Sequence, residues 1–252
     1  MLSASIAQSL DRTDPSQLEL AGIGCFAQVF KAADTGLQGE KRIYERLGSH
    51  PYILRCYGEY CGGGIPSGLV FEHHSAGTLA DNLDLSKYPY QRSQWPVQAA
   101  EVLQYIHSKN VIHSDLGSHT FLVQQDGSLA LADFEGSRID DDMTLVSYST
   151  RYARLDCDAG VSTKVDDIFA LGTVLYEITT GHLLYADCPS KEVRSLLKQR
   201  TFPDLANVPQ LLRMVIQNCW ANQCLTAEEV LIDLKGYSSC LTCAEPFEKL
   251  ET

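Results

Sequence analysis

Two short stretches decide the fold of this chain. They are Val111-Ile112-His113-Ser114-Asp115-Leu116 and, eighteen residues further on, Leu131-Ala132-Asp133-Phe134-Glu135-Gly136. The first follows an amphipathic helix that we predict over residues 95–110. A carboxylate on a loop between a helix and a strand can accept a hydroxyl proton, so Asp115 is a candidate general base. An aspartate after an apolar strand suits a hard cation that bridges phosphate oxygens, which makes Asp133 a candidate metal ligand.

A glycine pair lies near the start of the chain, well before these two stretches. Gly22 and Gly24 follow a predicted strand, and two glycines in this spacing let backbone N–H groups approach a phosphate. The third position of a G-x-G-x-x-G pattern is Ala27. Alone, the pair fits an ordinary hairpin as well as a nucleotide loop. The pair favours a nucleotide-binding loop only because it precedes the two decisive stretches in the chain.

The pattern of apolar residues changes along the chain. The first half predicts short strands with one helix among them, and helices dominate from about Thr78. Runs of strands followed by runs of helices favour an α+β fold, with a small β-rich lobe, a larger α-helical lobe and a cleft between them. The predicted strands are 18–23, 27–32, 68–73, 120–125 and 129–134, and the predicted helices are 40–47, 95–110, 166–181, 191–200, 209–220 and 226–237.

The order of motifs resembles the eukaryotic protein kinases: a glycine loop, a helix with a glutamate, an H-x-D loop and a D-F-x turn. Downstream, the segment 167–172 is similar to that family's D-x-W-S-x-G helix start, and Cys219-Trp220 to its C-W pair. Gly77-Thr78-Leu79, after Glu72-His73-His74, is similar to the hinge and the entry into the large lobe. The resemblance runs from about Leu18 to Leu234 and implies a two-lobed kinase-like fold with a shortened small lobe.

The resemblance also implies roles for individual residues. Asp115 would be the catalytic-loop base, with His113 beside it, and Asp133 would hold Mg²⁺. Thr120 stands at the position of a second metal ligand, and Asp167 would brace the catalytic loop from below. The residues that would cover or hold ATP are Gly22, Gly24, Val29, Glu40, Glu72 and His74, with Phe71 as the gate of the adenine pocket.

Several positions depart from the kinase pattern. The strand lysine that grips the ATP phosphates has no clear counterpart, and Lys31 is the candidate substitute. Ser114 replaces the usual arginine, which removes the pocket for a phosphorylated activation loop. Thr120 replaces asparagine, Gly117 stands where Ser/Thr kinases carry lysine, and Glu135 replaces the glycine of D-F-G. Losing the lysine and weakening one metal ligand would together cost on the order of 10⁴-fold in rate.

We therefore expect a kinase-like, ATP-binding protein that moves the γ-phosphate of ATP to a protein hydroxyl, Ser/Thr rather than Tyr, with weak activity. One alternative is a pseudokinase that serves as a binding or scaffolding module. Another is a small-molecule kinase of the aminoglycoside or choline type, which the kinase-like segment 167–172 disfavours. A further alternative is a gene model lacking a strand, because only eight residues separate Lys31 from Glu40.

Composition and charge limit the function classes. The 252 residues carry 20 Lys and Arg against 32 Asp and Glu, a net charge of −12. A field of this sign repels phosphate backbones and anionic lipids, so we expect neither nucleic-acid nor membrane binding. Nine scattered cysteines indicate free thiols in a reducing compartment. Neither a secretory signal nor an apolar run of about 18 residues is present, so we expect an intracellular, cytoplasmic monomer with a protein substrate or partner.

The motifs also predict domain boundaries. We expect an N-terminal extension over residues 1–17 and a kinase-like domain over 18–236. Within that domain the small lobe would be 18–74 and the large lobe 75–236. A C-terminal tail would follow over 237–252.

Overall fold

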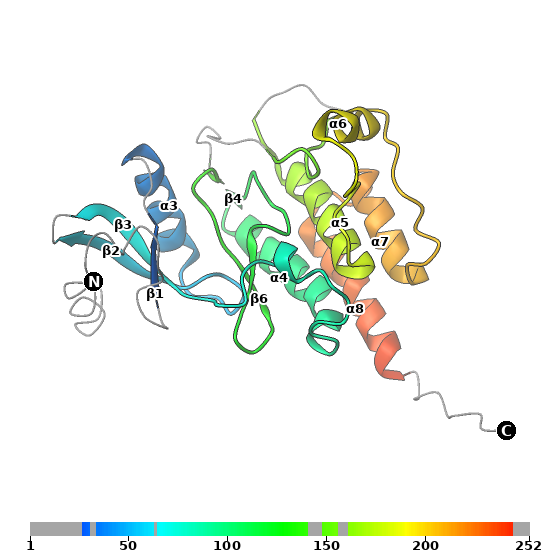
Figure 1. Ribbon diagram of the computed structural model, residues 1–252, viewed down its shortest axis with the longest axis horizontal. Helices are drawn as coiled ribbons and strands as arrows, with labels where there is room; N and C mark the ends of the chain where they lie inside the picture. The colour runs from blue at the N-terminus through cyan, green and yellow to red at the C-terminus, as the bar shows by residue number, and fades with distance from the viewer. Residues whose placement is uncertain (1–26, 31–33, 63–64, 141–147, 156–160, 244–252) are drawn as a thin grey trace.

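The computed structural model describes residues 27–30, 34–62, 65–140, 148–155 and 161–243 (Figure 1). These residues form two lobes, a small one with a sheet and one helix and a larger one dominated by helices. The predicted two-lobed α+β fold is thereby confirmed. Gly22, Gly24 and Lys31, which the sequence singled out, lie outside the described residues.

The small lobe holds a three-stranded antiparallel sheet in the order β1-β3-β2. Its strands are β1 (Ala27–Phe30), β2 (Cys56–Gly62) and β3 (Ile65–Glu72). The sequence did not predict β2. Its glycines weaken the strand signal, and Gly58, at φ 119°, lies at an irregularity in the pairing with β3.

Helix α3 (Asp34–Leu47) packs on this sheet and is longer than predicted. The prediction began the helix at Glu40, directly after Gly39. The helix instead starts six residues earlier and includes Gly36 and Gly39, although glycine is a poor helix former. Burial of Ile43 and Leu47 supplies the stabilisation, since tertiary packing of an apolar face outweighs intrinsic propensity.

The large lobe contains most of the helices, and the predicted ones are confirmed to within a few residues. The exception is the end of α8, which lies six residues beyond the predicted helix end at residue 237, so that predicted helix end is wrong. The helices are α4 (Trp95–Ser108), α5 (Lys164–Thr180), α6 (Ser190–Lys198), α7 (Gln210–Trp220) and α8 (Ala227–Cys243), with short 3₁₀ turns at Ala80–Asn82 and Gln91–Ser93.

Two small antiparallel pairs lie where the lobes meet. The predicted hairpin forms β5 (Phe121–Val123) and β6 (Leu129–Leu131), and β4 (Val111–Ile112) pairs with β7 (Arg138–Ile139). Strand β4 leads directly into the segment around Asp115, and β6 ends just before Asp133. The two decisive stretches of the sequence therefore both follow short strands.

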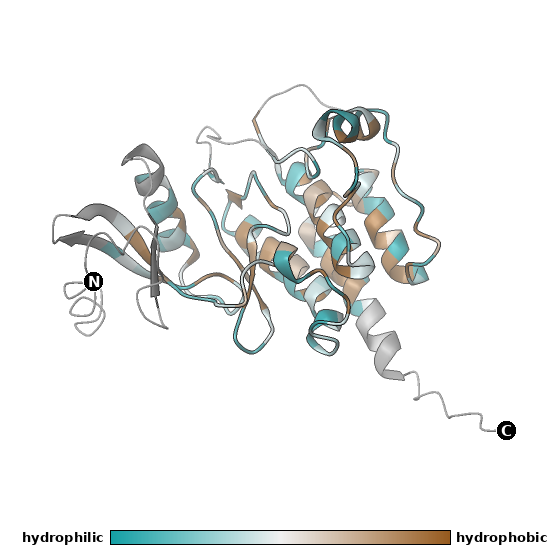
Figure 2. Ribbon diagram, in the orientation of Figure 1, coloured by the Kyte–Doolittle hydropathy of each residue, from teal (hydrophilic) through white to brown (hydrophobic). Residues whose placement is uncertain are grey.

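Helix α5 is the centre of the large lobe. It is buried along most of its length, and Figure 2 shows apolar stretches on α4, α5 and α7. Its N-terminus has a capping box formed by Thr163 and Asp166. Its C-terminus ends at Gly181, whose φ of 78° is the left-handed cap that the sequence predicted.

Both tryptophans of the chain lie in the core of the large lobe. The indole N–H of Trp95 donates to the Gly127 carbonyl at 2.8 Å. That of Trp220 donates to the Thr173 hydroxyl at 3.1 Å, and its ring stacks on Phe202. Within the described residues, no helix has the length and apolar composition needed to cross a membrane.

Candidate active site

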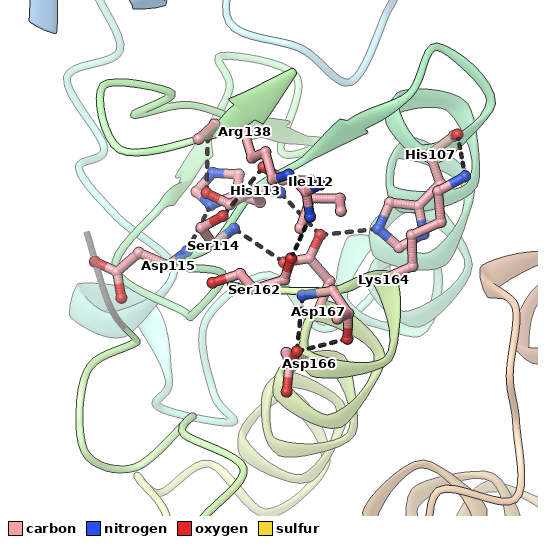
Figure 3. Close-up of polar contacts among 12 residues, drawn as sticks. His107, Ile112, His113, Ser114, Asp115, Arg138, Ser162, Lys164, Asp166 and Asp167 are labelled. Carbon is pink, nitrogen blue, oxygen red and sulfur yellow. Dashed lines mark hydrogen bonds and ion pairs between the residues drawn. The ribbon is translucent and has the colours of Figure 1, made fainter. Parts of the chain in front are cut away.

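A buried carboxylate on α5 holds the loop after β4 in place. The oxygens of Asp167 accept hydrogen bonds from the backbone N–H groups of His113 at 2.8 Å and Ser114 at 3.1 Å (Figure 3). The ring of His107 lies 2.8 Å from the same carboxylate, and the hydroxyl of Tyr148 also donates to it. Burial raises the pKa of Asp167, but these bonds outweigh it and keep the pKa below its ordinary value. Asp167 therefore braces the loop as an anion.

Ser114 takes a backbone conformation that the brace requires. Its φ is 69°, in the left-handed region that a serine rarely adopts, and the residue is fully buried. Both consecutive N–H groups can point at Asp167 only because the chain turns sharply here. The loop keeps its shape without an arginine side chain at this position.

His113 joins the two decisive stretches of the sequence. It is buried, its Nε2 lies 3.0 Å from the Ala132 carbonyl, and its ring packs against Phe134. Its own carbonyl accepts a bond from the Ser137 hydroxyl at 2.8 Å. Because it is buried and its Nε2 contacts the Ala132 carbonyl, His113 positions the loop and does not face solvent.

Asp115 is partly exposed at the outer side of the same loop. In Figure 3 its side chain points away from Asp167. One oxygen, Oδ1, accepts the backbone N–H of Ser149 at 2.9 Å. The other, Oδ2, lies 3.5 Å from Nε2 of His119. A partly exposed carboxylate on a braced loop is the arrangement that a general base needs.

Asp133 projects from a turn that its neighbour anchors. Phe134 is fully buried and packs against the rings of Tyr44 and His113. Glu40 of α3 accepts the Phe134 N–H at 3.3 Å. Asp133 itself is exposed and has φ 63°. The buried phenylalanine thus fixes a turn from which the aspartate reaches solvent.

Glu40 is a buried acid among other acids. Its pKa is raised from 4.5 to about 7, mainly by burial and also by the charges of Asp133 and Glu135, while the bond from the Phe134 N–H works in the opposite direction. Glu40 lies on α3, the helix predicted to carry it, and its carboxylate contacts the backbone of the turn Asp133-Phe134-Glu135.

The hydroxyl of Thr120 closes the loop on itself. It donates to the Gly117 carbonyl at 2.9 Å and accepts the Gly117 N–H at 3.2 Å, and the residue is buried. The sequence reasoning missed this structural role. With these two bonds made, the buried Thr120 hydroxyl oxygen has one lone pair left for the metal ion that the resemblance implied it would bind.

The predicted hinge residues lie at the end of β3 and directly after it. Phe71 is buried against Tyr44, and the Glu72 N–H donates to the Arg55 carbonyl at 2.9 Å. Burial lowers the pKa of His74. The backbone of Val29 pairs with Val70, but the side chain of Val29, like the glycine pair, lies outside what the structure describes.

Comparisons with known proteins agree with this geometry. The family model described as protein tyrosine and serine/threonine kinase matches residues 27–226, most of the chain. The chain belongs to the protein kinase family. The kinase domain is 29% identical over 191 residues to the mixed lineage kinase domain-like protein of Mus musculus, covering 69% of this chain and 40% of that one.

Two further relatives of the kinase domain are of different kinds. It is 28% identical over 194 residues to mitogen-activated protein kinase kinase kinase 20 of Arabidopsis thaliana, covering 70% of this chain and 56% of the relative. It is 26% identical over 257 residues to fibroblast growth factor receptor 1 of Xenopus laevis, covering 79% and 31%. The chain thus spans between about a third and just over half of these proteins.

Sequence reasoning missed several residues of this kinase domain's site. His107 and Tyr148 share the Asp167 carboxylate, and nothing in their local pattern marks them. His119 faces Asp115 from four residues away, a spacing that the sequence does contain. Among the described residues, no three His, Cys, Asp or Glu side chains gather closely enough to hold a metal ion by themselves.

Proposed function

We propose that this kinase domain binds ATP and slowly transfers its γ-phosphate to a protein hydroxyl, Ser/Thr rather than Tyr, with Asp115 as the base. The acceptor oxygen forms a bond to the γ-phosphorus, the bond to the bridging oxygen breaks, ADP leaves and Asp115 takes the hydroxyl proton. The observation that carries the proposal is the Asp115 carboxylate, partly exposed on a loop that Asp167 braces through two backbone N–H groups.

Among the described residues, Asp133 is the side chain that we propose would hold Mg²⁺. This ion is commonly held by one or two carboxylates together with substrate phosphates, and the exposed carboxylate of Asp133 is a hard oxygen ligand of that kind. Mg²⁺ would supply charge neutralisation at the phosphates. We assign Thr120 to the loop instead, because its hydroxyl already bonds to Gly117.

Two features of the described residues support slow transfer. Glu40 is buried and has a pKa of about 7, so keeping it ionised for an ion pair with a lysine costs free energy that an exposed glutamate would not have to supply. The Thr120 hydroxyl, which stands where the family has a metal-binding asparagine, is already bonded to Gly117. Removing one contact to transition-state charge costs about 100- to 1000-fold in rate.

A second candidate is a pseudokinase that binds nucleotide or a protein partner without transfer. It is favoured by the bond between Asp115 Oδ1 and the Ser149 N–H, which engages the candidate base within the chain itself. A small-molecule kinase remains a lesser alternative. We propose a protein substrate or partner, a monomeric state and a cytoplasmic location, with the net charge of −12 arguing against nucleic acid.

The test combines binding and turnover. Thermal unfolding is followed with ATP, with and without Mg²⁺, and transfer of label from γ-labelled ATP to a generic protein acceptor is measured for the wild type and Asp115→Asn. ATP at about 100 times its Kd adds about 2.7 kcal/mol to folding, which at about 2–4 °C per kcal/mol raises the midpoint by roughly 5–11 °C. We expect a Mg²⁺-dependent rise, and slow transfer that Asp115→Asn abolishes.

The outcomes separate the candidates. A Mg²⁺-dependent rise without transfer would favour the pseudokinase. Transfer to small alcohols but not to protein would favour the small-molecule kinase. Transfer that survives Asp115→Asn would show that another group accepts the proton.

A further inference from the structure

We propose that His119 is a positioning residue for Asp115, one that fixes the orientation in which this carboxylate meets the acceptor hydroxyl. The proposal rests on the proposed function, since it concerns the same transfer step. Its starting point is the contact of 3.5 Å between Nε2 of His119 and Oδ2 of Asp115.

The two oxygens of Asp115 are held differently. Oδ1 accepts the Ser149 N–H at 2.9 Å, which is an ordinary, well-formed hydrogen bond. Oδ2 has the longer contact to His119. Each oxygen keeps lone-pair capacity for a hydroxyl proton, but Oδ2 is the less tightly held of the two, and the imidazole beside it influences where that oxygen lies.

The ring of His119 is partly exposed and lies against Gly117 and Tyr152. An added Cβ at Gly117 would lie 2.5 Å from Cε1 of His119 and 2.8 Å from the ring of Tyr152. Glycine at 117 therefore leaves the space that the imidazole uses. The rings of His119 and Tyr152 pack together, with centroids 5.4 Å apart.

Tyr152 is in turn fixed by a buried polar network. Its hydroxyl donates to the Glu177 carboxylate at 2.9 Å and lies 2.8 Å from the Ser118 hydroxyl. Glu177 is fully buried and also accepts the Leu184 N–H at 3.1 Å. The position of the His119 ring is thus set by the core of the large lobe, which is what a positioning group requires.

A group that orients the base acts on the transfer step and not on ATP binding. Misplacing a reacting group by about 1 Å can cost roughly 100-fold in rate. We therefore expect His119→Ala to lower kcat by about 10- to 100-fold with the KM for ATP unchanged. His119→Gln retains an N–H donor close to the place of Nε2, and we expect it to restore most of the lost kcat.

The experiment measures kcat, the KM for MgATP and the thermal midpoint of the full chain for the wild type, His119→Ala, His119→Gln and a control, His182→Ala. His182 is an exposed histidine in the loop after α5. Gly117→Ala forms a second, independent arm. Its methyl group would displace the ring, so we expect it to lower kcat as His119→Ala does, and to add little when the two substitutions are combined.

Each kinetic result either supports or overturns the positioning role of His119. Turnover in the wild type with an unchanged kcat in His119→Ala would overturn the positioning role and leave the proposed function intact. An equal loss in the alanine and glutamine variants would also overturn it, because the retained N–H would then have no effect. A wild type that binds MgATP without any turnover would overturn the transfer function and this role together.

Discussion

Glu40 is a single residue whose titration should be visible in the stability of the whole domain. Its pKa is about 7 in the folded chain, against an ordinary value of 4.5. Between these values the folded chain binds more protons than the unfolded chain, so the wild type loses stability as pH rises from about 4.5 to 7. At about 1.4 kcal/mol per pH unit, the loss approaches 3 kcal/mol.

Glu40→Gln should remove this pH dependence. The amide oxygen can still accept the Phe134 N–H, and no charge is buried at high pH. We expect the variant to match the wild type near pH 4 and to become more stable above pH 7, by up to about 3 kcal/mol. Urea unfolding from pH 4 to 8 measures this, with the exposed Glu228→Gln as control. A constant difference at every pH would contradict it.

The same scale shows what the sequence could reveal about the site. Asp115 and Asp133 each stand in a short local motif, and in the structure the side chain of Asp133 is exposed and that of Asp115 partly exposed. The role of Thr120 could not be predicted, because its hydroxyl bonds to Gly117 only once the loop has closed. The approach of Tyr148 to Asp167 depends on the fold of a long segment, so no local pattern carries it.

At the level of secondary structure, Gly39 within α3 and Gly181 at the end of α5 should respond in opposite ways to substitution by alanine. Gly39 lies within α3, and an added Cβ there would meet no atom within 4 Å. Gly181 ends α5 with a φ of 78°, and a Cβ there would lie 2.8 Å from the side chain of Leu85. Alanine should therefore suit the first position and not the second.

We expect Gly39→Ala to raise the free energy of unfolding by about 0.5–1 kcal/mol. Gly181→Ala should lower it by about 1–2 kcal/mol, since the left-handed backbone disfavours a side chain even before the contact with Leu85 is counted. Urea unfolding of both variants, each serving as control for the other, tests the pair. A loss of stability in both variants would contradict the prediction for Gly39, because it would show that position 39 does not tolerate a side chain.

These helices also show why element boundaries were harder to predict than elements. Helix α5 has a capping box at one end and a glycine at the other, and both ends were predicted to within two residues. Helix α3 has glycines where its first turns lie, so its start was set too late. Strand β2, with Gly58 at a pairing irregularity, has a pattern too weak to recognise before β3 lies beside it.

At the scale of the molecule, the two lobes are joined through α3. The hydroxyl of Tyr105 on α4 donates to the Leu47 carbonyl at 2.5 Å. Arg46 bonds the Asp140 carboxylate with two nitrogens, but this pair is exposed and contributes little in water. The partly buried tyrosine should therefore be the stronger of these two links between the lobes.

Tyr105→Phe should weaken this junction while leaving the ring in place. We expect a loss of about 1 kcal/mol in the free energy of unfolding, the usual net contribution of one hydrogen bond. Backbone amides of α3 should exchange with solvent faster, whereas those of α5 should not. Hydrogen exchange measures both, and Tyr90→Phe, at an exposed tyrosine, is the control. Equal acceleration in α3 and α5 would contradict a local effect.

The burial of Trp95 and Trp220 has a consequence for spectroscopy. These are the two tryptophans of the chain, and both lie in the core of the large lobe. Tryptophan fluorescence therefore reports on that lobe alone, and a partial opening of the small lobe would leave the tryptophan signal unchanged. An engineered fluorophore on the sheet would make such an intermediate visible. Until one is present, a single smooth fluorescence transition is not proof that both lobes unfold together.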